Sequence, residues 1–161
     1  MSKSIIIGIS DLNIALSPDV LITYALGSCV GIALYDQAVK VAGLAHIMLP
    51  LSSEARDKSN IMKFADTATL ELINQMEKMG ASRRRITAKI AGGAQMFALQ
   101  PGNEAFNIGK RNVIATKQIL NDLNIRIIAE DTGMNYGRTV EFSADTGMLK
   151  VKSIAHGIKE I

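Results

Sequence analysis

Short apolar runs separated by turn-forming residues occupy the first third of the chain. Four of them have the length and the Ile, Val, Leu and Ala content of β-strands: 4–9, 20–24, 30–35 and 41–45. Between the first two runs, 11–13 and 17–19 carry turn formers, which predicts a loop there. The third and fourth runs are joined around Asp36, and Pro50 ends the fourth, so we expect these two to pair as an antiparallel hairpin.

The rest of the chain mixes helical and strand patterns. Apolar residues follow a 3.6-residue period from residue 61 to 79, which predicts a helix capped by Ser59 or Asn60 and ended by Gly80. A second helix is predicted over 107–124. Strand patterns cover the remaining apolar segments: 86–91, 125–129, and a hairpin of 139–142 and 148–154. His156 falls in a polar tail, where we expect a surface residue.

The order of these elements indicates the fold class. Strands outnumber helices and mostly follow one another, which favours α+β rather than an alternating α/β arrangement. No linker, repeat or low-complexity segment divides the 161 residues, so we expect one domain over 1–161.

Composition narrows the function classes. The chain is 48% hydrophobic and 20% charged, as in globular proteins, and its net charge of +3 is too small to indicate nucleic-acid binding. One cysteine cannot form an internal disulfide, and no apolar run approaches the roughly 18 residues of a membrane span. The apolar run near Met1 is also too short for a signal peptide. We therefore expect a cytoplasmic protein with no segment inserted in a membrane.

The single cysteine, Cys29, is the strongest candidate for chemistry. It follows the Gly27–Ser28 turn at the start of one predicted hairpin strand, and His46 ends the other strand. Antiparallel pairing would bring the two to the same end of a sheet, where an imidazole can activate a thiol. We expect Cys29 to be a reactive thiol with a pKa below the usual value of about 8.5. The alternative is that Cys29 is a small buried hydrophobe and His46 a core residue with satisfied hydrogen bonds, which by residue type alone is the commoner case.

Other motifs point to weaker alternatives. Arg83–Arg85 is either an anion-binding patch or, as we favour, a solvated turn. Asp-Thr-Gly occurs twice, at Asp131 and Asp145, but copies fourteen residues apart cannot form the two lobes of an aspartic protease. Cys29 and the two histidines show no ligand spacing, so no metal site and no cofactor are expected.

Five segments resemble the CheD family of chemoreceptor glutamine deamidases. The first is Thr23-Tyr-Ala-Leu-Gly-Ser-Cys-Val-Gly-Ile-Ala-Leu-Tyr-Asp36. The others agree in order and spacing: Gly43-Leu-Ala-His-Ile-Met-Leu-Pro50, Lys89-Ile-Ala-Gly-Gly-Ala-Gln-Met-Phe97, Asn107-Ile-Gly-Lys-Arg-Asn112, and Glu130-Asp-Thr-Gly133 with Gly137-Arg138. Met134 replaces a frequent glycine and Phe64 a common tyrosine, and neither departure touches Cys29 or His46.

The resemblance implies a fold and a mechanism. Two packed, mostly antiparallel or mixed β layers would form a sandwich-like core flanked by helices, with Gly92 and Gly93 letting the backbone approach the site. Cys29 would be the nucleophile, His46 the base and acid, and Thr23 the third member that orients His46. Independently of the resemblance, the Gly27–Ser28 turn beside Cys29 makes the amides around Gly27–Cys29 candidates for an oxyanion hole.

The resemblance also implies partners. The substrates would be cytoplasmic helices of methyl-accepting chemoreceptors, and the phosphatase CheC would be a binding partner. Some members of the family also hydrolyse glutamyl methyl esters. The competing interpretation is a non-catalytic module that binds receptors or CheC and adjusts signalling without turnover.

Overall fold

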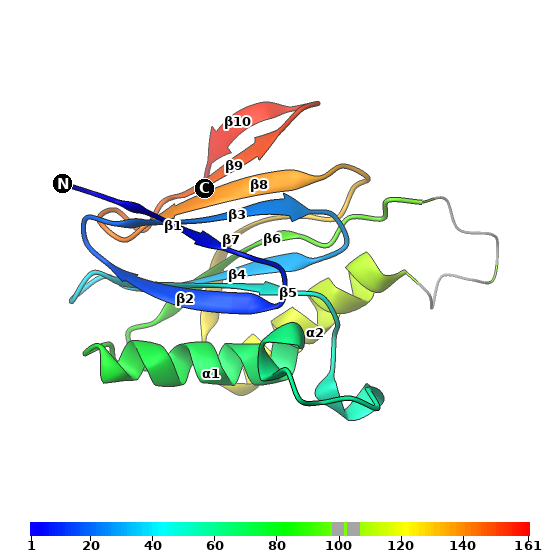
Figure 1. The fold of residues 1–161 in the computed structure, drawn as a ribbon, viewed down its shortest axis with the longest axis horizontal. Coiled ribbons are helices and arrows are strands. Elements are labelled where there is room, and N and C mark those ends of the chain that lie inside the picture. The colour runs from blue at the N-terminus through cyan, green and yellow to red at the C-terminus, as the bar shows by residue number, and fades with distance from the viewer. Residues whose placement is uncertain (98–101, 103–106) are drawn as a thin grey trace.

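Two five-stranded sheets pack face to face, and both helices cover the outer face of one of them (Figure 1). The computed structural model describes residues 1–97, 102 and 107–161. Sheet A has the strand order β1 (Ser4–Ile7), β3 (Val20–Leu26), β8 (Arg138–Ser143), β9 (Leu149–Ser153) and β10 (Gly157–Glu160). Sheet B has the order β2 (Asp11–Leu16), β5 (Val41–Ile47), β4 (Val30–Asp36), β6 (Thr87–Gly92) and β7 (Arg126–Thr132).

The two sheets are mixed but mostly antiparallel. Only the pairs β1–β3 and β6–β7 are parallel among the strand pairs of the described residues. The expected α+β class, with two β layers flanked by helices, is confirmed. No helix in the described part of the chain is long and apolar enough to cross a membrane.

Sheet B is buried on both faces, which explains the unbroken apolar runs of β4 and β5. Every residue of these two strands is buried. Alternate residues face in opposite directions. Ile32 and Leu34 pack with Leu72 and Met76 of helix α1 (Ala65–Lys78) in one core cluster, whereas Ala33 packs with residues of sheet A in the other. Such two-sided burial is typical of a strand in the middle layer of three.

Helix α1 lies close against β5 because one strand position has no side chain. A Cβ atom at Gly43 would lie 2.8 Å from Leu72 Cδ1 and 2.9 Å from Met76 Sδ. Helix α2 (Ile108–Asp122) covers the other half of the same face, beside β6 and β7. The helices therefore leave the inner face of sheet B free to pack on sheet A.

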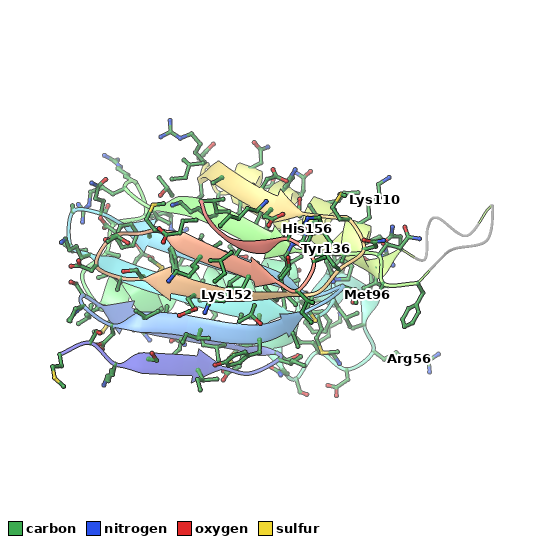
Figure 2. The ribbon with its side chains drawn as sticks, turned by 90° about the horizontal axis from the view of Figure 1, so that it is seen from above. Arg56, Met96, Lys110, Tyr136, Lys152 and His156 are labelled. Carbon is green, nitrogen blue, oxygen red and sulfur yellow. The ribbon has the colours of Figure 1, made fainter. Side chains whose placement is uncertain are left out.

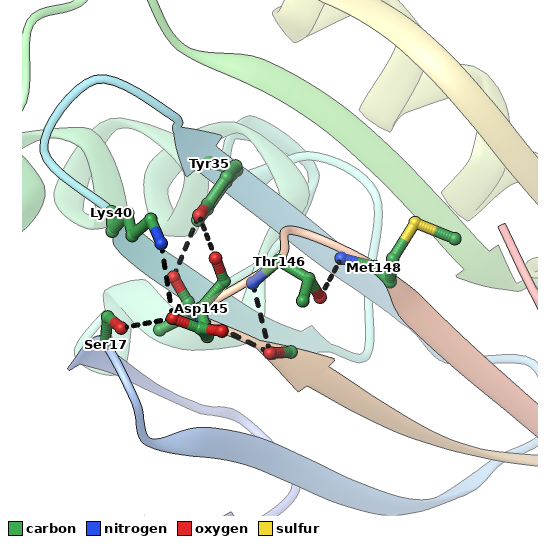
Figure 3. Close-up of polar contacts among 8 residues, drawn as sticks. Ser17, Tyr35, Lys40, Asp145, Thr146 and Met148 are labelled. Carbon is green, nitrogen blue, oxygen red and sulfur yellow. Dashed lines mark hydrogen bonds and ion pairs between the residues drawn. The ribbon is translucent and has the colours of Figure 1, made fainter.

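At the end of the sheets remote from Cys29, Tyr35 joins the two layers (Figure 3). Its ring meets that of Phe142 edge to face at a centroid distance of 6.0 Å, and its hydroxyl donates to the carbonyl of Ala144 at 2.8 Å. Beside it, Ser17 and Lys40 both donate to one carboxylate oxygen of Asp145 in the β8–β9 turn, at 2.7 and 3.3 Å. These contacts join the two sheets at the end opposite the candidate catalytic residues.

Three sequence-based boundaries are wrong. The predicted loop at 11–13 is part of β2, because Leu12 is buried and the Asp11 and Asn13 carboxyl and amide oxygens accept from the next backbone amide. The first helix, predicted from residue 61, begins four residues later, at Ala65, because Asn60 caps a short 3₁₀ turn, η2 (Ile61–Lys63), that precedes α1. A second 3₁₀ turn, η1, covers Ser52–Glu54.

The third error concerns the polar tail. Residues 157–160 form the edge strand β10, although every side chain in it is exposed. His156 is exposed, as expected, and its ring lies 4.4 Å from that of Tyr136.

The Arg83–Arg85 run is structural in part: Arg85 binds the buried carboxylate of Asp36 at 2.9 Å.

Candidate active site

Thr23 and His46 meet between the two sheets. Thr23 lies on β3 of sheet A and His46 on β5 of sheet B, and both are fully buried. The Thr23 Oγ1 atom is 2.7 Å from His46 Nδ1. Residues 43 and 45 of β5 face the helices. Because successive residues of a strand point to opposite faces, His46 faces sheet A.

The hydrogen-bond inventory determines which imidazole nitrogen carries the proton. Thr23 Oγ1 also lies 2.8 Å from the carbonyl oxygen of Ile7, which can only accept. The single hydroxyl proton therefore points to Ile7, and the hydroxyl oxygen accepts from His46 Nδ1–H. A neutral ring protonated at Nδ1 has its lone pair at Nε2, as a general base requires. That Nε2 atom is buried and has no hydrogen-bond partner among the described residues.

Burial keeps His46 neutral. Desolvation by burial lowers the pKa of His46 from 6.5 to about 4. Thr23 is uncharged and offers only a lone pair. The imidazole is therefore neutral at pH 7.

Cys29 lies at the same end of sheet B. It immediately precedes β4, where Val30 pairs with Ile47 and Gly31 with His46. The expected hairpin is thus confirmed, with this register. The Cys29 side chain is half-buried against the core cluster that lies between the sheets. In this structure it makes no hydrogen bond to His46 Nε2.

The expected low pKa of Cys29 is wrong. Burial raises the pKa of the thiol, an effect that outweighs the lowering by a backbone hydrogen bond. The expectation assumed a charged imidazole beside the sulfur, but a neutral ring provides no positive charge to stabilise a thiolate. The resting pair is a neutral thiol and a neutral imidazole.

The Cys29 loop, Gly27–Cys29, is held by its carbonyl groups. The carbonyl of Gly27 accepts from the amide of Ala94 at 2.9 Å, and that of Cys29 from the amide of Gly93 at 2.8 Å. The carbonyl of Ser28 accepts from the side chain of Asn112 at 2.9 Å. No other described residue accepts a hydrogen bond from the amide of Ser28 or Cys29. The backbone hydrogen bond that lowers the pKa of the Cys29 thiol comes from the amide of Cys29 itself.

Two glycines make this close approach possible, as the resemblance led us to expect. Gly92 has a φ of +106°, and a Cβ atom there would lie 2.3 Å from the carbonyl oxygen of Cys29. Gly93 has a φ of +66°, and its Cβ would lie 2.2 Å from Val113 Cγ2. A side chain at either position would displace the Cys29 loop or helix α2.

A hollow of about 250 Å³ adjoins the Cys29 loop. It is lined by Ser28, Met96, Phe97 and the start of α2 around Asn107. Met96 and Phe97 are exposed, and Met96 lies with Lys110 toward one end of the molecule (Figure 2). The site therefore opens beside apolar side chains. Among the described residues, no group of three or more His, Cys, Asp or Glu side chains is placed to hold a metal ion.

Comparison with known proteins gives the family. The model of the family described as CheD chemotactic sensory transduction matches residues 48–153. A probable chemoreceptor glutamine deamidase CheD of Caldanaerobacter subterraneus subsp. tengcongensis is 54% identical over 160 residues, 99% of each chain. The protein belongs to the CheD family. A second CheD relative, from Lachnoclostridium phytofermentans, is 48% identical over 161 residues, 100% of each chain.

The full-length CheD alignments include the segments that carry Thr23, Cys29 and His46, which precede the part matched by the family model. Among solved structures, a Neisseria meningitidis protein of the DUF152 family has a TM-score of 0.48 and 9% identity, covering 80% of this chain and 64% of that chain.

The low pKa of His46 predicts a pH-dependent stability. In an unfolded chain this residue takes up a proton below pH 6.5, whereas in the folded protein it stays neutral to about pH 4. The unfolded state therefore binds the extra proton, and the free energy of unfolding falls as the pH drops from 6.5 toward 4, by roughly 3 kcal/mol from this group.

Urea unfolding at pH 7 and pH 4.5 would measure this loss. Carboxylates also titrate there, so His46→Gln, which cannot take up the proton, serves as the reference. We expect the wild type to lose roughly 2–3 kcal/mol more than His46→Gln over this interval. Equal losses would contradict a buried neutral imidazole.

A second prediction concerns Gly92. Gly92→Ala and Gly80→Ala both place a side chain at a left-handed φ, +106° and +100°, but only Gly92 has atoms within 4 Å of the added Cβ. Each should lose about 1–2 kcal/mol of stability from backbone strain. Gly92→Ala should lose a further 1–3 kcal/mol, roughly, from overlap with the Cys29 carbonyl.

Iodoacetamide labelling of Cys29 provides the second measurement. Displacement of the Cys29 loop should change the labelling rate in Gly92→Ala and leave it unchanged in Gly80→Ala. Indistinguishable behaviour of the two variants would show that the close contact at Gly92 does not control the loop.

Proposed function

We propose that this protein is a cysteine-dependent glutamine deamidase that converts glutamine side chains on the cytoplasmic helices of chemoreceptors to glutamate. Its full-length relatives are named as probable chemoreceptor glutamine deamidases. The observation that carries the proposal is the Thr23–His46 hydrogen bond, because it leaves an unpartnered basic Nε2 at the end of the sheet where Cys29 lies. Acting on cytoplasmic helices implies a cytoplasmic location.

The first half-reaction releases ammonia. As Cys29 Sγ attacks the side-chain amide carbon of the glutamine, its proton passes to His46 Nε2. The tetrahedral intermediate then collapses, and the same proton goes to the departing nitrogen. Ammonia leaves and a thioester joins Cys29 to the substrate.

The second half-reaction restores the enzyme. His46 Nε2 takes a proton from a water molecule as that water attacks the thioester carbon. Collapse returns the proton to Cys29 Sγ and releases glutamate. No charge accumulates on Thr23, whose hydroxyl accepts from Nδ1–H throughout and holds the ring in one tautomer.

The neutral resting pair determines the timing of proton transfer. A raised thiol pKa and an imidazole pKa of about 4 make a preformed thiolate–imidazolium pair unfavourable. We therefore infer that proton transfer accompanies formation of the sulfur–carbon bond. The negative charge then moves to the amide oxygen of the substrate, where the amides of Ser28 and Cys29, which donate to no other described residue, form the proposed oxyanion hole.

The glutamate that deamidation produces explains how the reaction would act in chemotaxis signalling. Each conversion adds a carboxylate to a receptor helix, which increases like-charge repulsion between neighbouring helices and creates a site for methyl esterification. Hydrolysis of glutamyl methyl esters would proceed through the same thioester. Binding to a CheC-type phosphatase rests on the family resemblance.

Cys29→Ala tests whether the protein is an enzyme or an adaptor. A purified cytoplasmic fragment of a methyl-accepting chemoreceptor is incubated with wild type or variant and analysed by mass spectrometry. We expect the wild type to add about one dalton for each converted glutamine and Cys29→Ala to add none, while its urea unfolding stays within about 1 kcal/mol of wild type. Undiminished conversion by Cys29→Ala would remove Cys29 from the mechanism.

Thr23→Val tests the orienting hydrogen bond. Valine keeps the shape of the side chain but leaves His46 Nδ1–H and the Ile7 carbonyl without partners. The ring can then adopt the other tautomer, which places the proton on Nε2 and removes the base. A lost bond to a buried group is worth about 1–3 kcal/mol, so we expect kcat to fall roughly tenfold to a few hundredfold.

Thr23→Ser is the matched variant for this test, since it keeps the hydroxyl and loses only a methyl group. Its kcat should lie near that of the wild type. Equal rates for Thr23→Val and wild type would show that Cys29 and His46 act without Thr23.

A further inference from the structure

Asn112 is buried although its side chain is polar. It lies on α2 with no exposed surface, at a position that faces sheet B. Burying an amide is unfavourable unless hydrogen bonds replace those to water. The partners of this residue therefore indicate what it does.

The Asn112 side-chain amide joins the two segments that carry Cys29 and His46. Its Nδ2 atom donates to the carbonyl of Ser28 and to the carbonyl of Met48, both at 2.9 Å. Ser28 directly precedes Cys29, and Met48 follows β5 two residues after His46. One NH₂ group thus bridges the nucleophile segment and the end of the strand that carries the base.

The orientation of the Asn112 amide follows from its partners. Both carbonyl oxygens can only accept, so the nitrogen must face them. The Oδ1 atom is then left buried without a hydrogen-bond partner among the residues that the structure describes. An unsatisfied oxygen is unfavourable, which indicates that the two donated hydrogen bonds are what the position requires.

Holding the Ser28 carbonyl also sets the direction of the Cys29 amide. The peptide unit is planar and trans, so its N–H points opposite to its C=O. With the Ser28 carbonyl bound to α2, the Cys29 N–H must point away from the helix. A carbonyl that accepts a hydrogen bond also makes its peptide N–H a stronger donor.

We propose that Asn112 is a positioning residue for Cys29: its side-chain amide fixes the Ser28–Cys29 peptide relative to the end of β5, and thereby aims the Cys29 N–H at the developing oxyanion. This inference rests on the proposed deamidase function. It assigns Asn112 no contact with the substrate.

The test uses Asn112→Ala with Thr116→Val as its matched control. Thr116 lies one turn further along α2, is fully buried, and has a hydroxyl without a partner among the described residues. Both variants remove a buried polar group from the same helix, but only Asn112→Ala releases the Ser28 carbonyl. Asn112→Ser keeps one hydroxyl donor and replaces Asn112→Ala if the alanine variant does not fold.

The first readout is spectroscopic and needs no substrate. The amide resonance of Cys29 in a ¹H–¹⁵N spectrum should shift upfield in the Asn112 variant and stay in place in Thr116→Val. The second readout is deamidation of the chemoreceptor fragment, where kcat should fall roughly 10- to 100-fold with KM nearly unchanged. Thr116→Val should keep the wild-type kcat.

The outcomes separate the two proposals. A folded Asn112 variant with an unmoved Cys29 resonance and wild-type kcat would overturn the positioning role. An equal fall in stability in both variants without loss of kcat would show that Asn112 is structural only. Absence of deamidation by the wild type would refute the proposed function, whereas the spectroscopic comparison would still report whether Asn112 orients the Cys29 peptide.

Discussion

The Thr23–His46 hydrogen bond crosses the interface between the two sheets, and the candidate site depends on it. Neither strand alone could orient the imidazole, since the hydroxyl comes from β3 of sheet A and the ring from β5 of sheet B. The bond forms only if the sheets pack in one register. The apolar cluster between the sheets, which includes Leu21, Leu44 and Phe142, provides that packing. The hydrophobic core thus determines the protonation state of the imidazole.

A second constraint acts on the Cys29 loop, which is held by a chain of hydrogen bonds through three neighbouring segments. The amides of Gly93 and Ala94 bind its carbonyls, and the carbonyl of Gly92 in turn accepts from the amide of Gly133 at 2.9 Å. The fully buried guanidinium of Arg138 donates to the carbonyl of Gly133 at 3.1 Å. Arg138 also pairs with Asp131 at 3.3 Å, and its guanidinium lies 4.4 Å from the centre of the Tyr136 ring.

This chain of hydrogen bonds explains why the Asp-Thr-Gly motif at Asp131 matters without being catalytic. Its carboxylate neutralises Arg138, and its glycine joins β7 to the backbone behind the Cys29 loop. Removal of the Asp131 carboxylate would leave the buried Arg138 guanidinium without its ion-pair partner, whereas Asp131 also pairs with Lys159 at 3.2 Å. The motif is therefore structural in this fold.

Much of the fold was predictable because local patterns agreed with the packing. The hairpin that brings Cys29 and His46 to one end of a sheet follows from two apolar runs and a turn, whereas its register, with Gly31 opposite His46, came only from the structure. β2 was missed because Asp11 and Asn13 normally indicate turns, but at this sheet edge their side-chain oxygens accept from the backbone amides of Leu12 and Ile14. β10 was missed because a fully exposed strand has no alternation of apolar and polar residues.

Contacts between residues far apart in the chain could not be predicted from the sequence pattern. Asn112 touches Ser28 across 84 positions, and nothing in a helix of ordinary composition indicates such a contact. The wrong prediction of a low pKa for Cys29 also arose because the sequence does not show the long-range packing around His46. A cysteine near a histidine indicates a thiolate only if the histidine is charged, and the charge depends on how completely the two sheets exclude water from it.

The neutral pair has a consequence for selectivity. A preformed thiolate would react with any electrophile that reached it. In the proposed mechanism the half-buried neutral thiol of Cys29 reacts only when an acyl carbon and an oxyanion hole are both in place. An unactivated amide is a poor electrophile, so the proposed attack requires the amides of Ser28 and Cys29 to stabilise the oxyanion as the proton moves to His46. Exposed apolar side chains of Met96 and Phe97 line the hollow beside Ser28, where the proposed helical substrate would bind. Reactivity thus arises from the seated substrate together with the site, which suits an enzyme that must modify a few glutamines among many.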